Sequence, residues 1–145
     1  MRKTTASRVL AVQALYQFDL RGEPFLKELA DFLKSSSDNA EVIALAVGLF
    51  RGCADHADEI DACIGAVAEH WDLSRMAAVD RAILRLGAHE LLYRPEVPPK
   101  VAIDEAIRLA KKFSTAESGA FVNGILDRIM AAQTGRTGAP GGRKP

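Results

Sequence analysis

Cysteine is scarce in this sequence: the chain of 145 residues has only Cys53 and Cys63. We expect both to be small apolar groups of a core, because a free thiol behaves as a small hydrophobe. Together with His56 and His70 they match no common zinc-binding spacing. The sequence therefore predicts no metal site.

Long apolar runs are also absent. The longest uncharged stretch in the hydrophobic middle, residues 42–50, has nine residues, whereas a helix needs about 20 to cross a bilayer. The basic start is not followed by an apolar segment and a small-residue cleavage site. We therefore expect no membrane segment, no signal peptide and a cytoplasmic location.

The motifs of common enzymes are missing as well. The sequence contains no phosphate-binding loop, no dinucleotide fingerprint, no H-E-x-x-H and no nucleophile elbow. Asp104 and Glu105 are adjacent, but successive residues on a helix do not face each other. The three histidines share no motif. These absences predict a binding protein without cofactors or catalysis.

The net charge of zero hides an uneven distribution. Residues 1–21 carry a charge of +3, residues 134–145 another +3, and the residues between them −6. From Arg51 to Arg75 the intervening charged residues are all acidic. Such a chain can attract a polyanion at one place and a basic partner at another. A solvated charged face is the alternative interpretation, and charge alone leaves it open.

Strand signals are nearly absent, and apolar residues recur at helical spacing. The pattern predicts an all-α chain of about seven helices, with Ser74 as a helix N-cap. One domain should span residues 1–133, and the glycine- and proline-rich residues 134–145 should form a disordered basic tail. The expected helices cover residues 4–20, 25–34, 40–67 as two helices divided at Gly52 near the Asp55-His56 segment, 76–93, 99–113 and a segment after Ser114.

The segment ESGAFVNGIL, residues 117–126, carries two conflicting signals. Asn123-Gly124 is typical of a hairpin turn. The capping-box spacing of Ser114 and Glu117, and the apolar period that continues to Ile129, favour a helix instead. We predict the helix, with Gly124 allowing a neighbouring helix to approach closely.

Three segments carry a family resemblance: AVQALYQFD, VDRAILRLGAHELLY and VPPKVAIDEAIRLAKKFSTAESGAFVNGILDRI. Over residues 5–130 they resemble the NusB family of bacterial transcription antitermination factors. The resemblance implies two perpendicular three-helix bundles that share a core. It also implies binding to the boxA element of nascent ribosomal RNA transcripts together with NusE, a protein of the small ribosomal subunit, in a complex that helps RNA polymerase resist termination.

The resemblance also implies roles for particular residues. Phe121 would be a platform on which a base stacks, and Asp80 would meet NusE. Family members often begin with a denser arginine cluster, so we expect modest RNA affinity without NusE. The implied RNA-binding residues are Arg2, Lys3 and Arg8 for phosphates, and Tyr16, Arg85, Glu117 and Phe121 for bases or backbone. By composition alone, Tyr16 and Phe121 would be core residues.

Two other functions compete with this hypothesis. One is the NusB-like accessory domain of ribosomal RNA methyltransferases, which would need a glycine-rich strand-to-helix turn downstream, and we expect none in this chain. The other is a helical protein-binding adaptor without an RNA role. The sequence does not decide between a monomer and a homodimer.

Overall fold

The computed structural model describes residues 1–68 and 72–137. Over these residues it contains seven α-helices, two short 3-10 helices and no strand, which confirms the predicted fold class. No helix in this part of the chain is long and apolar enough to cross a membrane. The elements are α1 (Lys3–Arg21), η1 (Glu23–Lys27), α2 (Leu29–Ser36), α3 (Ala40–Asp55), α4 (Ala57–Val67), η2 (Leu73–Arg75), α5 (Ala78–Tyr93), α6 (Pro99–Phe113) and α7 (Ala116–Thr137).

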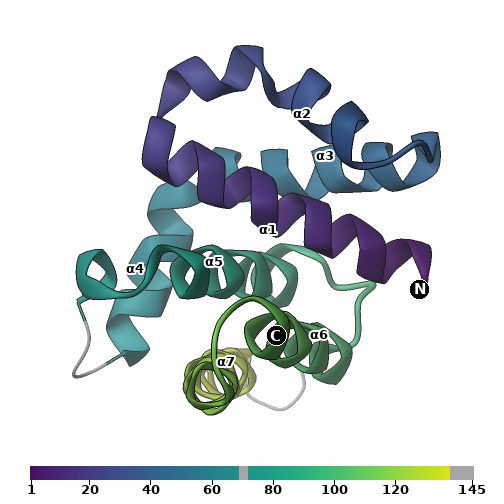
Figure 1. Cartoon of the computed structure of the whole chain (residues 1–145). Coiled ribbons are helices and arrows are strands. Elements are labelled where there is room, and N and C mark those ends of the chain that lie inside the picture. The colour runs from purple at the N-terminus through teal and green to yellow at the C-terminus, as the bar shows by residue number, and fades with distance from the viewer. Residues whose placement is uncertain (69–71, 138–145) are drawn as a thin grey trace.

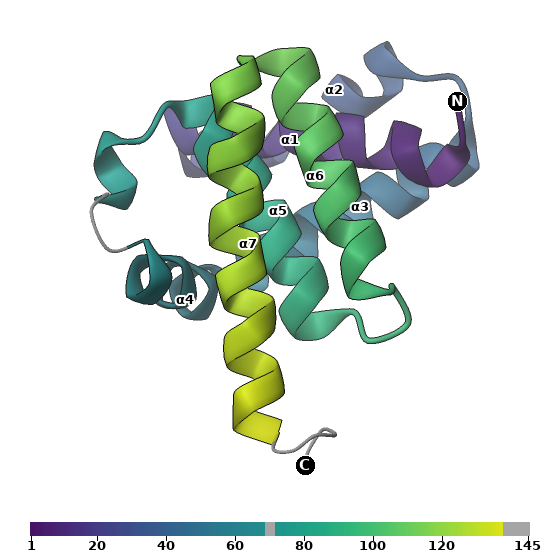
Figure 2. The same cartoon turned by 90° about the horizontal axis from the view of Figure 1, so that it is seen from below.

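Two groups of helices meet at α5. Helix α1 packs on α2 and α3, whereas α6 and α7 pack on each other, and α5 contacts α1, α3, α4, α6 and α7. In Figure 1, α1 runs across the view and α7 is seen end-on; Figure 2 shows α6 and α7 running crosswise to α1. One continuous cluster of buried side chains reaches from α1 to α7. The two crossed bundles with a shared core are therefore confirmed.

The segment 40–67 divides at His56, within the predicted Asp55-His56 segment, but Gly52 itself is not the break. His56 has φ −115° and ψ 25°, and its N–H bonds to the Gly52 carbonyl oxygen at 3.2 Å. Gly52 lies inside α3, where a Cβ would be 2.3 Å from Cε1 of His89 on α5. The glycine is therefore required for close packing between α3 and α5, and the helix continues through it.

The start of α5 also differs from the prediction. The Asp72 carboxylate accepts hydrogen bonds from the N–H of Ser74 at 3.1 Å and from its hydroxyl at 2.9 Å. Ser74 therefore lies inside the 3-10 turn η2, which Asp72 caps, and α5 begins only at Ala78. The predicted cap is wrong because the carboxylate two residues earlier already holds the N–H and hydroxyl of Ser74.

Helix α7 runs through the Asn123-Gly124 pair, so the helix prediction is confirmed and the hairpin is excluded. The cap is one residue later than predicted: Thr115 Oγ1 accepts the N–H of Ser118 at 3.1 Å. The close approach predicted at Gly124 is wrong, because a Cβ there would meet nothing within 4 Å. Helix α7 approaches α5 elsewhere, where a Cβ on Gly87 would lie 2.7 Å from Leu126 Cδ1.

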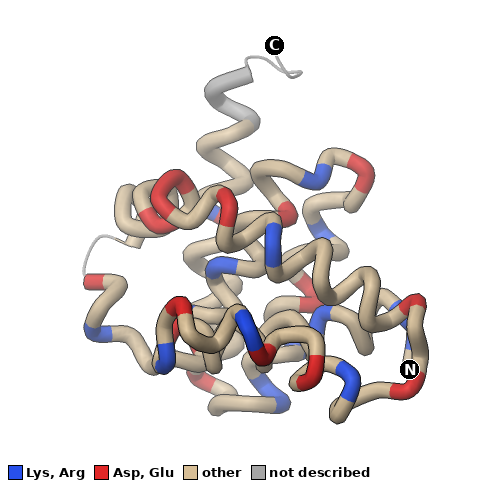
Figure 3. The backbone as a smooth tube through the Cα atoms, turned by 90° about the horizontal axis from the view of Figure 1, so that it is seen from above, with Lys and Arg blue, Asp and Glu red and all other residues tan. Residues whose placement is uncertain are grey.

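The predicted tail begins inside α7, because the helical backbone continues past residue 133 to Thr137. Residues 138–145 of that tail, and His70 of the cysteine and histidine set, lie outside the described residues. In the described part of the chain no group of three or more His, Cys, Asp or Glu residues could hold a metal ion. Figure 3 shows basic and acidic residues interspersed along the backbone. Whether a given cation is available to a ligand therefore depends on the carboxylates next to it.

Candidate nucleic-acid interface

The basic N-terminus is exposed at the start of α1. Arg2 is the N-cap residue of α1, and its side chain forms no ion pair with the described residues. Lys3 Nζ lies 2.7 Å from Glu41 Oε1, and these two side chains are 55% and 63% exposed. An ion pair so exposed contributes only about 0–1 kcal/mol. Arg2 and Lys3 are therefore accessible to a polyanion, and their contact with RNA phosphates stays a prediction.

Arg8 is not placed to contact a phosphate, which corrects the sequence prediction. The residue is only 6% exposed. Its Nε and Nη2 donate to the two Glu90 carboxylate oxygens at 2.9 and 2.7 Å, and its Nη1 donates to Glu105 at 3.3 Å. Burial alone would lower the pKa of Arg8, but the two carboxylates outweigh burial and raise it. Arg8 is thus a buried cation that joins α1 to α5 and α6.

Arg85 likewise forms ion pairs with carboxylates. Its Nε and Nη2 donate to Asp61 of α4 at 2.8 and 3.0 Å, and its Nη1 lies 3.4 Å from Asp19 of α1. These residues line a hollow between α1, α3, α4 and α5 that does not include Phe121. The Arg85 guanidinium is thus held by two carboxylates and lines a different hollow from Phe121, and its contact with RNA stays a prediction.

Phe121 and Glu117 lie together in the first two turns of α7. They line one hollow of about 260 Å³, which also includes Ala77 and Asp80 at the start of α5. Glu117 is exposed, while the Phe121 ring is half-buried and packs against the core. A half-buried aromatic ring that lines an open hollow is of the chemical type on which a nucleobase stacks, because every base has a π-face.

Asp80 is nearly enclosed beneath this hollow, at 9% exposure. Its Oδ2 accepts a hydrogen bond from the Ser118 hydroxyl at 3.1 Å, which ties the start of α5 to the start of α7. Its Oδ1 is buried and has no hydrogen-bond partner among the described residues. A buried acceptor without a donor is costly. This Oδ1 oxygen is therefore either a source of strain or the acceptor for a hydrogen bond from a ligand.

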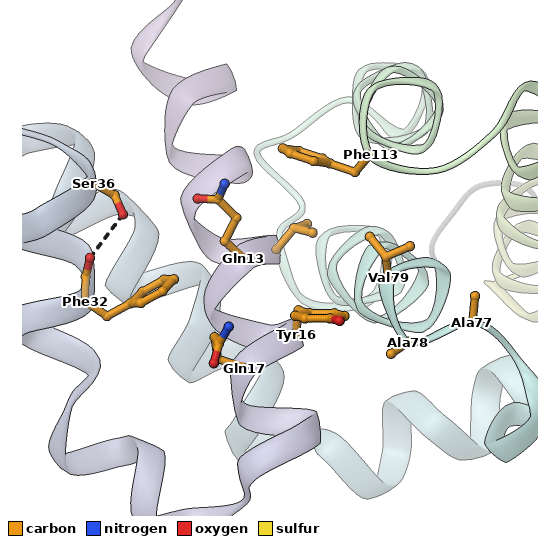
Figure 4. A pocket seen from close by; sticks show the side chains of 10 residues that line it. Gln13, Tyr16, Gln17, Phe32, Ser36, Ala77, Ala78, Val79 and Phe113 are labelled. Atoms are coloured by element: carbon orange, nitrogen blue, oxygen red, sulfur yellow. Dashed lines mark hydrogen bonds between the residues drawn. The ribbon is translucent and has the colours of Figure 1, made fainter.

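Tyr16 lines a larger groove of about 660 Å³ between α1, α2, the start of α5 and the end of α6. Figure 4 shows Gln13, Tyr16 and Gln17 projecting from α1, with Phe113 of α6 also bordering the groove. Tyr16 is 36% exposed, so it is not a core residue. Ala77 lines both this groove and the Phe121 hollow, and the two are therefore adjoining parts of one surface.

Comparison with known proteins identifies the family. A sequence model of the NusB family matches residues 5–131. The chain belongs to the NusB family. The transcription antitermination protein NusB of Anaeromyxobacter dehalogenans strain 2CP-1 is 49% identical over 130 residues, which cover 89% of this chain and 91% of that protein. The NusB protein of Myxococcus xanthus is 40% identical over 135 residues, with coverage of 90% and 95%.

Solved NusB structures share the fold of this chain. T. maritima NusB superimposes with a TM-score of 0.81 at 36% identity, covering 90% of this chain and 92% of that one. A chain in the crystal structure of the antitermination factors NusB and NusE in complex with dsRNA gives a TM-score of 0.81 at 31% identity, with coverage of 91% and 98%. In that structure the NusB fold is bound with NusE and double-stranded RNA.

Sequence reasoning missed Arg75. It is exposed, it lines the same hollow as Phe121 and Glu117, and its side chain forms no hydrogen bond or ion pair with the described residues. Arg75 lies outside the three segments that carry the family resemblance, and in the sequence it stands out only as the first basic residue after the acidic stretch that follows Arg51. Only the fold brings this cation into the same hollow as an aromatic ring 46 positions later in the chain.

Proposed function

We propose that this chain is a transcription antitermination factor that binds the boxA RNA of nascent ribosomal RNA transcripts together with NusE. The observation that carries the proposal is the pair of accessible aromatic side chains, Tyr16 and Phe121, on two adjoining hollows of a NusB-family fold. Because antitermination acts on RNA polymerase during transcription, we propose the cytoplasm as its location. The proposal includes no catalytic step and no cofactor.

Single-stranded RNA is the form that suits this surface. Unstacked bases bind to aromatic faces and expose their edges to polar side chains. We propose that one base stacks on Phe121 while the Glu117 carboxylate accepts a hydrogen bond from an N–H group of RNA. Tyr16 would contact the adjoining nucleotides, and Arg2 and Lys3 would bind phosphates elsewhere along the strand. The stacked base should contribute about 1–3 kcal/mol.

NusE is proposed to bind beside the RNA. Asp80 is retained as a contact for NusE because its buried Oδ1 lacks a donor, which a side chain of a partner could supply after a small local rearrangement. The exposed acids of α4, which include Asp58 and Glu59, suit a basic partner. This arrangement would let NusE complete an RNA site that has few free cations of its own.

The test is a titration with boxA RNA and with a scrambled RNA of the same composition, with and without NusE, at two salt concentrations. We expect boxA to bind more tightly than the scrambled RNA, with a larger difference when NusE is present. Equal affinities for the two RNAs in the presence of NusE would contradict the proposal. Binding of NusE without any RNA binding would instead support the protein-binding adaptor.

A further inference from the structure

The proposed RNA surface needs cations, but two of the arginines predicted to bind RNA are paired with carboxylates in the structure. Arg8 is enclosed by Glu90 and Glu105, and Arg85 is held by Asp61 and Asp19. A guanidinium that leaves such a pair for a phosphate would leave carboxylates unpaired in a partly buried place, which is costly. A phosphate near Phe121 must therefore be bound by some other group.

Arg75 is the cation that the fold places at the Phe121 hollow. It is the last residue of η2, and its side chain is exposed. No ion pair within 4 Å joins Arg75 to the nearby Asp72, whose Oδ1 accepts both the N–H and the hydroxyl of Ser74. Arg75 therefore keeps its guanidinium donors available to a ligand.

Arg75 and Glu117 line the same hollow but form no ion pair within 4 Å. The hollow thus keeps two opposite charges apart, and its remaining walls include the Phe121 ring and the side chain of Met76, which is 7% exposed. A nucleotide matches all of these features, since it combines an anionic phosphate, a flat apolar face and N–H donors on the base edge. An acidic or a basic peptide side chain would match only one of the two charges.

We propose that Arg75 binds the backbone phosphate of the nucleotide whose base stacks on Phe121. This inference rests on the proposed RNA-binding function and adds a phosphate contact that compensates for the enclosed Arg8. Arginine suits this role because its planar guanidinium can donate two parallel hydrogen bonds to phosphate oxygens. A phosphate contact positions the strand and carries no sequence information by itself.

The experiment compares Arg75→Gln with the matched control Arg51→Gln in the full-length protein with NusE. Arg51 on α3 is also exposed and lies outside both the Phe121 hollow and the Tyr16 groove. Affinity for boxA RNA and for scrambled RNA is measured at several salt concentrations, and circular dichroism checks the fold. Both substitutions remove one exposed positive charge, so the net charge of the two variants is the same.

For Arg75→Gln we expect a several-fold weaker affinity for both RNAs and a slope of log K against log salt that is smaller by about 0.7–1. Arg51→Gln should change neither quantity. An unchanged affinity and slope in Arg75→Gln, while the unsubstituted protein binds boxA, would overturn this inference and leave the proposed function standing. Weaker binding of NusE without RNA, at an unchanged salt slope, would also overturn it by assigning Arg75 to the protein partner. If the unsubstituted protein binds no RNA, the proposed function itself fails and this inference fails with it.

Discussion

The contact between α3 and α5 provides a sharp test of the fold, through the substitution Gly52→Ala. The added Cβ would lie 2.3 Å from His89 Cε1 and 2.4 Å from its Nε2, distances that real Cβ atoms essentially never show. The His89 side chain is 3% exposed and its ring lies 5.8 Å from that of Tyr93. Because the imidazole is enclosed, it can move away only if its neighbours also move.

The expected change in unfolding free energy for Gly52→Ala follows from two opposing effects. Overpacking a well-packed core costs about 1–3 kcal/mol, while replacing a helical glycine by alanine gains about 1 kcal/mol in helix propensity. Gly124→Ala in α7 is a matched control, because a Cβ there meets nothing within 4 Å and only the propensity gain remains. The difference in unfolding free energy between the two alanine variants should therefore equal the overpacking cost alone, about 1–3 kcal/mol.

The assay is urea unfolding followed by circular dichroism, with the midpoint and the m-value compared among the variants. Gly124→Ala should be more stable than the unsubstituted protein, and Gly52→Ala should be less stable than Gly124→Ala. In His89→Ala, which lacks the ring, the same Gly52→Ala change should cost less, as a double-mutant cycle would show. Equal stability of Gly52→Ala and Gly124→Ala would refute the close contact between α3 and α5.

Three further predictions concern charge and recognition. Burial lowers the pKa of His89 from 6.5 to about 4. As the pH falls from about 6.5 to 4 the unfolded chain therefore binds a proton before the folded chain does, and roughly 3 kcal/mol of stability should be lost. Melting curves at several pH values measure this loss, which should be smaller in His89→Leu. Glu90→Ala removes the two-pronged partner of the buried Arg8 and leaves it only Glu105. This change should destabilise the fold by about 3 kcal/mol in urea unfolding, and a cost below about 1 kcal/mol would contradict the buried pair. Phe121→Ala should weaken boxA binding by about 1–3 kcal/mol in a titration, whereas unfolding of the variant would show that the ring serves the core.

Most helices could be predicted from local patterns. Helix α6 begins at Pro99 as expected, because proline is suited to the first turn, and it ends at Phe113. The caps were less predictable, because neighbouring polar side chains compete for the same N–H groups. Asp72 caps the 3-10 turn η2 and holds Ser74 inside it, α5 begins after Ala77 without a side-chain cap, and Thr115 replaces Ser114 at the start of α7. Such competition depends on details of the loop conformation that spacing alone does not specify.

The candidate site was predicted in part. The aromatic residues Tyr16 and Phe121 border adjoining hollows, and Glu117 lines the same hollow as Phe121. The RNA contacts themselves stay predictions that the titrations would test. The arginines were predicted less well, since Arg8 and Arg85 are held by carboxylates.

The sequence by itself determined the helical class, the number of α-helices and the family, because these depend on apolar spacing within each helix and on residue order. Only the tertiary structure decided which cations remain available to a ligand. Arg8 is enclosed by Glu90 and Glu105, which lie 82 and 97 positions away in the chain. Whether a charge faces solvent or a carboxylate depends on such distant partners, because electrostatic pairing in a folded chain follows distance in space and not separation in sequence.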